Sequence, residues 1–149
     1  MKVTEIETIH VDELPNVLWV QVHTDEGLIG LGETFFGADA VGSHIHEFIA
    51  PYLIGKNPLE IEKHSSRMTG YAGRGGSGAE MRATSAVDIA LWDIWGQSAN
   101  QPIYQMLGGA SRDKVRVYNT CAGYTYVRKA SAQVTANFGL NAKKKHRSV

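Results

Sequence analysis

A glycine-rich segment, Gly73-Arg74-Gly75-Gly76-Ser77-Gly78, is the part of this sequence best suited to contact an anion. Its spacing matches G-x-G-x-x-G, which in dinucleotide-binding proteins follows a strand inside a βαβ unit. Here the preceding residues, 58–68, have the apolar spacing of an amphipathic helix. No Gly-Lys pair follows to make a phosphate-binding P-loop. The context therefore argues against a nucleotide site.

Two interpretations of the glycine-rich segment remain open. In the first it is a flexible connection, because Ser77-Gly78-Ala79-Glu80 has the capping-box pattern that opens a helix. In the second it faces an anion, with the guanidinium of Arg74 and the backbone N–H groups of Gly75 and Gly76 holding a carboxylate.

The side chains that bind metals or act as bases are not grouped at useful spacings. His44 and His46 are two positions apart, so they point away from each other on a helix. His64 lies on another predicted helix and is expected to be exposed. Asp88 and Asp93 are separated by about 140° around a helix axis and are expected to make structural hydrogen bonds. We therefore predict no catalytic residue and no metal ligand in this sequence.

Composition excludes several classes of function. The 149 residues contain 15 basic and 15 acidic side chains, so no general attraction to nucleic acid or to an anionic membrane is expected. Cys121 is the only cysteine, which rules out an intrachain disulfide. The start of the chain lacks the apolar core of a signal peptide, and no apolar run approaches the roughly 20 residues of a membrane span. We expect a cytoplasmic protein.

The first third of the chain predicts an antiparallel meander of three strands, at residues 2–11, 17–24 and 28–36. The second strand has the clearest alternation of side chains. Asp25-Glu26-Gly27 is a tight turn in which Gly27 can take a positive φ. Gly30 and Gly32 indicate either a bulge or a close approach of another backbone.

Helical spacing replaces the alternation after residue 37. Asp39 is the predicted N-cap of a helix that runs to about Leu53, with Pro51 in its last turn. The predicted apolar face of this helix consists of Val41, Ile45, Phe48 and Ile49. A second helix is predicted from Pro58, at its first position, to about Gly70.

A third helix follows the glycine-rich segment. Its predicted core stripe consists of Ala83, Val87, Ala90, Leu91 and Ile94. Residues 102–107 predict one more short turn of helix, ended by Gly108-Gly109, and residues 115–121 resemble a strand. Strands grouped before helices predict an α+β fold: a three-stranded antiparallel meander, then a helical bundle, and an orphan strand at the end.

The third helix also carries a family resemblance. Residues 83–97, ATSAVDIALWDIWGQ, and residues 102–109, PIYQMLGG, resemble the signature of the mandelate racemase/muconate lactonizing family of the enolase superfamily. Thr24–Glu33 is similar to the family's second hairpin, and Val115-Arg116-Val117-Tyr118 resembles its entry into the first barrel strand. The resemblance covers residues 1–124.

The resemblance implies a capping domain that sits over a modified (β/α) barrel. It divides the chain into a capping domain at 1–110, a first barrel strand at 111–125 and an irregular polar tail at 126–149. A complete barrel needs about 250 residues, and 40 follow Gly109. We therefore expect a truncated member that is inactive alone.

The family chemistry is the abstraction of a proton α to a carboxylate, with Mg²⁺ stabilising the enediolate, as in acid-sugar dehydratases and racemases. Its base and metal ligands lie on later barrel strands. Two cap loops shape substrate choice, and they match residues 12–16 and the glycine-rich segment. The resemblance thus assigns substrate contact to Arg74, Asn16, Gly75 and Gly76, with a carboxylate-bearing molecule such as an acid sugar as the ligand.

A different class of function stays open. The same domain could be a standalone binding or oligomerisation module, in which the helix faces that normally meet the barrel would be exposed apolar patches. Such patches predict a partner or a homo-oligomer.

Overall fold

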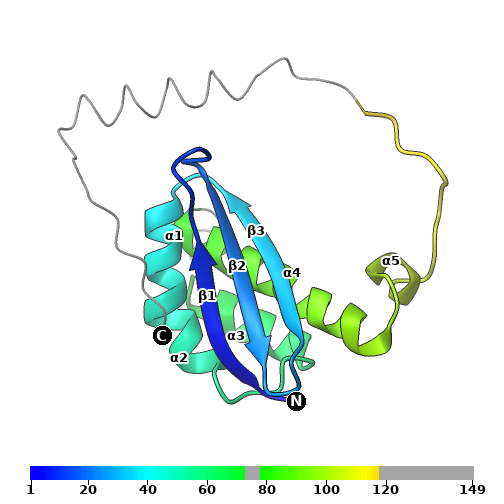
Figure 1. Cartoon of the computed structure of the whole chain (residues 1–149), viewed down its shortest axis with the longest axis horizontal. Helices are drawn as coiled ribbons and strands as arrows, with labels where there is room; N and C mark the ends of the chain where they lie inside the picture. Colours follow the sequence, from blue (N-terminus) through cyan, green and yellow to red (C-terminus); the bar gives the residue numbers. More distant parts are fainter. Residues whose placement is uncertain (73–77, 118–149) are drawn as a thin grey trace.

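A three-stranded antiparallel sheet forms one layer of the fold, and helices cover one of its faces (Figure 1). The computed structural model describes residues 1–72 and 78–117. The strands are β1 (Val3–Ile9), β2 (Val17–Thr24) and β3 (Ile29–Phe35), in the order β1-β2-β3. This arrangement, followed by helices, confirms the predicted α+β meander.

The central strand β2 shows why one face of the sheet is buried. Leu18, Val20 and Val22 alternate with half-buried residues and are 3% exposed or less. Side chains alternate between the two faces along a strand, so the three lie on the same side. The apolar core therefore lies between this face and the helices. On the other face, Trp19 Nε1 donates a hydrogen bond of 2.9 Å to Glu33 on β3.

Two glycines of β3 let a helix pack directly on the strand. A Cβ atom on Gly32 would lie 1.9 Å from the carbonyl oxygen of Ala86, and one on Gly30 would lie 2.1 Å from that of Ala90. The pairing of β2 with β3 proceeds without a bulge. Close backbone approach is therefore the correct alternative of the two predicted from these glycines. Gly27, in the β2–β3 turn, has φ 81°, as expected.

The first helical stretch is interrupted by a wider turn. It consists of α1 (Ala38–His44), a π-helical segment η1 (Ile45–Ile49) and α2 (Ala50–Leu53). The Ala50 N–H donates to the carbonyl of Ile45, five residues back. Pro51 follows immediately and has no N–H to donate, and its ring would crowd the carbonyl four residues earlier in a regular α-helix. The wider turn before Pro51 accommodates this conflict.

The π-helical segment overturns part of the predicted apolar face. Val41, Ile45 and Ile49 are buried, but Phe48 is 67% exposed and stacks on the His44 ring. More than four residues per turn rotate Phe48 away from the core, which a constant helical period cannot predict. The predicted N-cap was also wrong, because Gly37 (φ 70°) holds that position and Asp39 lies in the first turn.

The helix α3 (Ile61–Ala72) begins later than predicted. Pro58 lies in a turn before it rather than at its first position, and the Asn57 side chain accepts a hydrogen bond of 3.1 Å from the Leu59 N–H. His64 is fully buried, contrary to the prediction that it is exposed. Its Nε2 lies 2.8 Å from the Asn57 carbonyl oxygen and its Nδ1 lies 2.9 Å from the Tyr52 hydroxyl.

The longest helix, α4 (Ala79–Ala99), lies behind the sheet (Figure 1). Its N-cap residue is Gly78, with no side-chain cap. The predicted core stripe is confirmed, since each of its residues is 0% exposed: Ala83, Val87, Ala90, Leu91 and Ile94. No helix in the described part of the chain is long and apolar enough to span a membrane.

The chain then makes the short helix α5 (Ile103–Met106), which ends before Gly108 and Gly109 as predicted. Both glycines have positive φ. The predicted last strand is not confirmed. Val115 and Val117 belong to no strand and are 70% and 84% exposed. A strand needs a neighbour to hydrogen-bond with, and the sheet of the described residues contains only β1, β2 and β3. The rest of the predicted strand, 118–121, lies outside the described residues.

Candidate functional site

The candidate site lies at one end of the sheet, where the β1–β2 loop, the end of β3 and the first turn of α4 meet (Figure 1). Asn16 is half-buried in the loop, and its carbonyl oxygen accepts a hydrogen bond of 2.7 Å from the Phe36 N–H. Arg82 on α4 donates a hydrogen bond from Nη1 to the Phe35 carbonyl oxygen. These contacts bring the β1–β2 loop and the start of α4 to the same end of the molecule.

Only one of the four predicted substrate contacts can be placed. Asn16 lies at this end of the sheet, whereas Arg74, Gly75 and Gly76 lie outside the described residues. The described chain resumes at Gly78, one residue before α4 begins. The substrate-binding role of all four residues stays a prediction.

Arg82, which no sequence pattern singled out, is exposed and reaches across to Phe35 on β3. Its guanidinium carbon lies 5.8 Å from the centre of the Phe36 ring, within the range of a cation–π interaction. The Phe35 and Phe36 rings in turn meet edge to face, with centres 4.4 Å apart. Arg82 lies four residues before the buried Ala86, so helical spacing places both on one face of the helix. The sequence does not show that this face meets β3.

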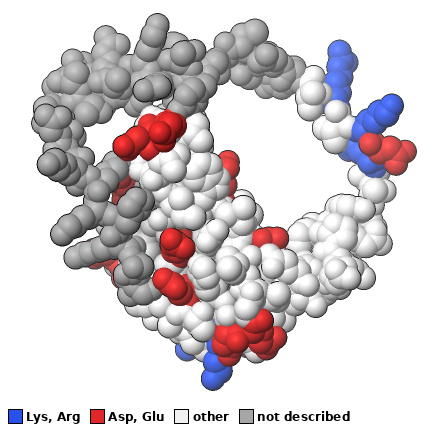
Figure 2. Space-filling view, viewed as in Figure 1, with Lys and Arg blue, Asp and Glu red and all other residues white. Residues whose placement is uncertain are grey.

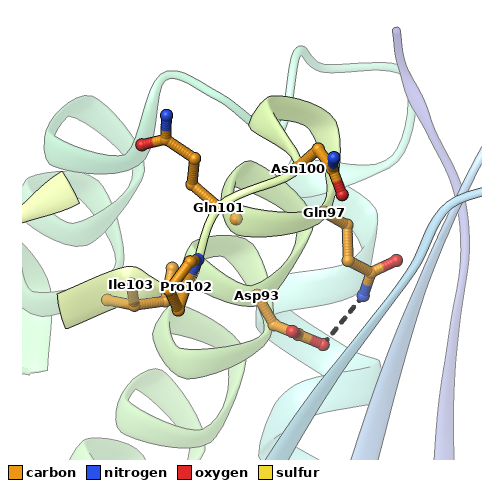
Figure 3. A pocket seen from close by; sticks show the side chains of 7 residues that line it. Asp93, Gln97, Asn100, Gln101, Pro102 and Ile103 are labelled. Atoms are coloured by element: carbon orange, nitrogen blue, oxygen red, sulfur yellow. Dashed lines mark hydrogen bonds between the residues drawn. The ribbon is translucent and has the colours of Figure 1, made fainter. Parts of the chain in front are cut away.

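Two further α4 side chains form hydrogen bonds with backbone groups along the edge of β3 that does not pair with β2. Asp93 accepts a hydrogen bond of 2.8 Å from the Leu31 N–H, and Gln97 donates one of 2.7 Å to the Ile29 carbonyl oxygen. Gln97 also donates to Asp93 at 3.0 Å (Figure 3). The prediction that Asp93 makes structural hydrogen bonds is confirmed. Unpaired edge strands invite association with other chains, so these side chains protect β3.

A shallow depression of about 340 Å³ lies beside this edge, between the end of α4 and the start of α5 (Figure 3). It is lined by Asp93, Gly96, Gln97, Asn100, Gln101, Pro102 and Ile103. The Asp93 and Gln97 side chains are engaged with each other and with β3. The depression therefore has fewer free polar groups than its composition suggests.

Asp88 is the acid whose surroundings change its ionisation. Burial raises its pKa above the ordinary value of 3.8, while hydrogen bonding with the Ser65 and Trp92 side chains acts in the opposite direction. Its Oδ1 atom is buried without a hydrogen-bond partner among the described residues. Folding therefore disfavours the carboxylate form of Asp88 relative to the protonated form.

We expect Asp88→Asn to stabilise the folded protein more at neutral than at acidic pH, relative to wild type. A raised pKa means that the folded state binds the proton more tightly than the unfolded state, so stability falls as pH rises past 3.8 and through the folded-state pKa. Asparagine resembles the protonated form at every pH. Urea unfolding of both proteins at about pH 4 and pH 7 should show the variant gaining relative to wild type at the higher pH. An identical difference at both values would contradict this account.

The histidines predicted to point apart contact different neighbours. His44 stacks on Phe48, and His46 Nε2 lies 2.8 Å from the Thr8 hydroxyl on β1. Burial lowers the pKa of His46. Within residues 1–72 and 78–117, no three His, Cys, Asp or Glu side chains gather closely enough to hold a metal ion.

The sheet, the covering helices and the loop-bearing end define an enolase-type N-terminal domain. The chain belongs to the mandelate racemase/muconate lactonizing enzyme family, since the family's N-terminal domain model matches residues 4–108.

Curated and structural relatives agree with this assignment. The D-galactonate dehydratase of Verminephrobacter eiseniae is 40% identical over 125 residues, covering 83% of this chain and 32% of that protein. An enolase of the mandelate racemase subgroup from Agrobacterium tumefaciens is 51% identical, with a TM-score of 0.78, covering 94% of this chain and 37% of that one. An enolase from Pantoea ananatis, with bound D-gluconate and Mg, is 40% identical, with a TM-score of 0.67, covering 75% and 28%. The chain thus spans about a third of the length of these relatives.

The described residues do not suit the Mg²⁺ that accompanies the Pantoea relative. Asp93 already accepts two N–H groups on one carboxylate oxygen, and Asp88 has a raised pKa, which disfavours the charged form that a metal requires. No reaction step through a metal can be derived from these side chains.

Proposed function

We propose that this chain is the substrate-capping domain of an acid-sugar dehydratase. The observation that carries the proposal is the meeting of the β1–β2 loop with the start of α4 at one end of the sheet, in a domain whose relative dehydrates D-galactonate. The ligand would be a carboxylate-bearing sugar acid. Asn16, Arg74, Gly75 and Gly76 would contact it, with the arginine guanidinium pairing with the carboxylate.

In this proposal the chemistry belongs to the part of the relatives that this chain does not span. The family's barrel would supply the base and the Mg²⁺ ligands, and the cap would orient the acid and exclude water. We propose that residues 1–110 form the cap and 111–125 lead into the barrel, with 126–149 as a polar tail.

Large apolar side chains are exposed on α4, on α5 and directly after α5, and we propose that the rest of the enzyme covers them. They are Ile89, Trp95, Tyr104 and Leu107, which are 49%, 36%, 56% and 67% exposed. Figure 2 shows no charged side chain over α5. Exposed apolar side chains of this size fit contact with another domain.

The test is a chimera in which residues 1–110 replace the N-terminal domain of the Verminephrobacter dehydratase. We expect Mg²⁺-dependent release of a 2-keto acid from at least one member of a sugar-acid panel, and no release by the 149-residue chain alone. A folded chimera that is inactive on the whole panel, beside an active parent, would contradict the proposal. EDTA-sensitive turnover by the 149-residue chain would contradict it equally.

The role of Arg74 is tested in the same chimera. Arg74→Ala should raise KM for the acid by about tenfold or more, since an ion pair with a carboxylate is lost, with kcat changed less. Arg74→Lys keeps the charge but not the two parallel hydrogen bonds, so its KM should lie between those of the wild-type chimera and Arg74→Ala. Unchanged kinetics in both variants would remove Arg74 from the site.

The same exposed apolar side chains also favour a second candidate, a standalone binding or oligomerisation module. Size-exclusion chromatography of the 149-residue chain distinguishes the two when combined with the chimera. A defined oligomer together with an inactive chimera favours the module, and an active chimera favours the cap.

A further inference from the structure

Phe36 adopts a backbone conformation that a bulky residue rarely adopts. Its φ is 74°, in the left-handed region, where the Cβ atom crowds the backbone. Phe36 comes directly after β3 and is 53% exposed, so burial of its ring does not hold it there. Such strain persists only where surrounding contacts enforce it.

Contacts from two other segments hold this residue. From α4, Arg82 donates to the carbonyl oxygen of Phe35, which precedes the strained residue, and its guanidinium lies over the Phe36 ring at 5.8 Å. From the β1–β2 loop, the Asn16 carbonyl oxygen accepts the Phe36 N–H at 2.7 Å. Asn16 and Phe36 lie one step beyond the Val17–Phe35 pair in the register of β2 and β3. The Phe35–Phe36 peptide group therefore links the two segments, because its carbonyl oxygen accepts from Arg82 and its N–H donates to Asn16.

We propose that Arg82 is a positioning residue that locks Phe36 in the left-handed conformation and thereby fixes Asn16 and the β1–β2 loop relative to α4. The role of this clamp in substrate selection rests on the function proposed above. The clamp itself does not, because it is made entirely by Asn16, Phe35, Phe36 and Arg82. Lysine cannot replace the arginine fully, since a single ammonium does not offer a planar group that both donates and covers a ring.

Hydrogen exchange in the 149-residue chain tests the clamp without any assay of activity. Arg82→Ala should speed exchange of the Phe36 amide by about tenfold, corresponding to the loss of one hydrogen bond to a charged group. Amides that pair β2 with β3 should change much less, which separates the clamp from general loosening. Arg82→Lys should retain part of the protection.

A double variant tests whether Arg82 acts by holding the strained conformation of Phe36. Glycine adopts φ 74° freely, so Phe36→Gly removes the need for the clamp. In that background, Arg82→Ala should change exchange at position 36 by less than about threefold. An effect of equal size in both backgrounds would overturn the proposal, as would an unchanged Phe36 amide in the Arg82→Ala chain.

The chimera adds a functional readout. Arg82→Ala should raise KM more than it lowers kcat, because a loosened loop weakens binding without removing a reacting group. If the chimera proves inactive, the capping proposal fails while the exchange result still decides the clamp. If the chimera is active and Arg82→Ala leaves KM unchanged although exchange quickens, the clamp exists but does not serve the substrate, which overturns its proposed role.

Discussion

Replacing Gly32 with alanine is expected to destabilise the domain by at least about 3 kcal/mol, at the upper end of the range for overpacking. The added Cβ would lie 1.9 Å from the Ala86 carbonyl oxygen and 2.9 Å from its carbonyl carbon. Both atoms belong to the α4 backbone, so no side-chain rotation relieves the clash. The helix must move away from β3, and the buried stripe of α4 moves with it. Urea unfolding monitored by tryptophan fluorescence measures the loss.

Gly42→Ala is the matched control for this prediction. Gly42 lies in α1 with an ordinary φ, and its added Cβ would meet nothing closer than the Leu18 side chain at 3.8 Å. Alanine is favoured over glycine in a helix by up to about 1 kcal/mol, so this variant should equal or exceed wild-type stability. If Gly32→Ala costs no more than about 0.5 kcal/mol, the range of an ordinary surface change, direct packing of α4 on β3 is wrong.

The β3 glycines also show what the sequence could predict of the fold. Gly30 and Gly32 sit at alternate positions of a strand, so both face the same side, and two missing side chains on one face indicate a close neighbour. The apolar stripe of α4 was predicted from its helical period alone. Neither pattern identifies the other as its partner, but the short meander leaves few faces available.

Positions that depend on a break in the period could not be predicted. Phe48 has the spacing of a core residue, and a single widened turn before Pro51 moves it into solvent. His64 shows the opposite error: a polar residue beside a lysine was expected at the surface, and two hydrogen-bond partners from other segments permit its burial.

The candidate site was predictable only in part for a related reason. The two loops were located by resemblance, and Asn16 does lie where the β1–β2 loop meets β3. Arg82 makes its contacts with residues 46 and 47 positions earlier in the chain, a pairing that only the packing of α4 on β3 creates. No local pattern distinguishes this arginine from a solvated one on the same helix.

The His64 side chain joins three segments of the helical layer. The Asn57 carbonyl oxygen can only accept, so Nε2 carries the hydrogen and donates to it. Nδ1 then accepts from the Tyr52 hydroxyl. The ring thereby ties α3 to α2 and to the turn between them. Because the side chain is fully buried, its removal leaves both a cavity and two polar groups without their partner.

His64→Ala should therefore cost about 3 kcal/mol, combining cavity formation with lost hydrogen bonds, as measured by urea unfolding. Tyr52→Phe removes one of the two hydrogen bonds of His64 and leaves the imidazole ring in place, so it should cost about 1 kcal/mol. His44→Ala is the control for histidine content, because His44 is only half-buried and stacks on an exposed ring; its cost should stay within about 0.5 kcal/mol. Equal stability losses at positions 64 and 44 would show that His64 is not the buried connection between α2 and α3. A large loss in His64→Ala together with no loss in Tyr52→Phe would instead assign the stabilisation to packing and to the Asn57 carbonyl, because the tyrosine hydroxyl can then find water in place of the ring.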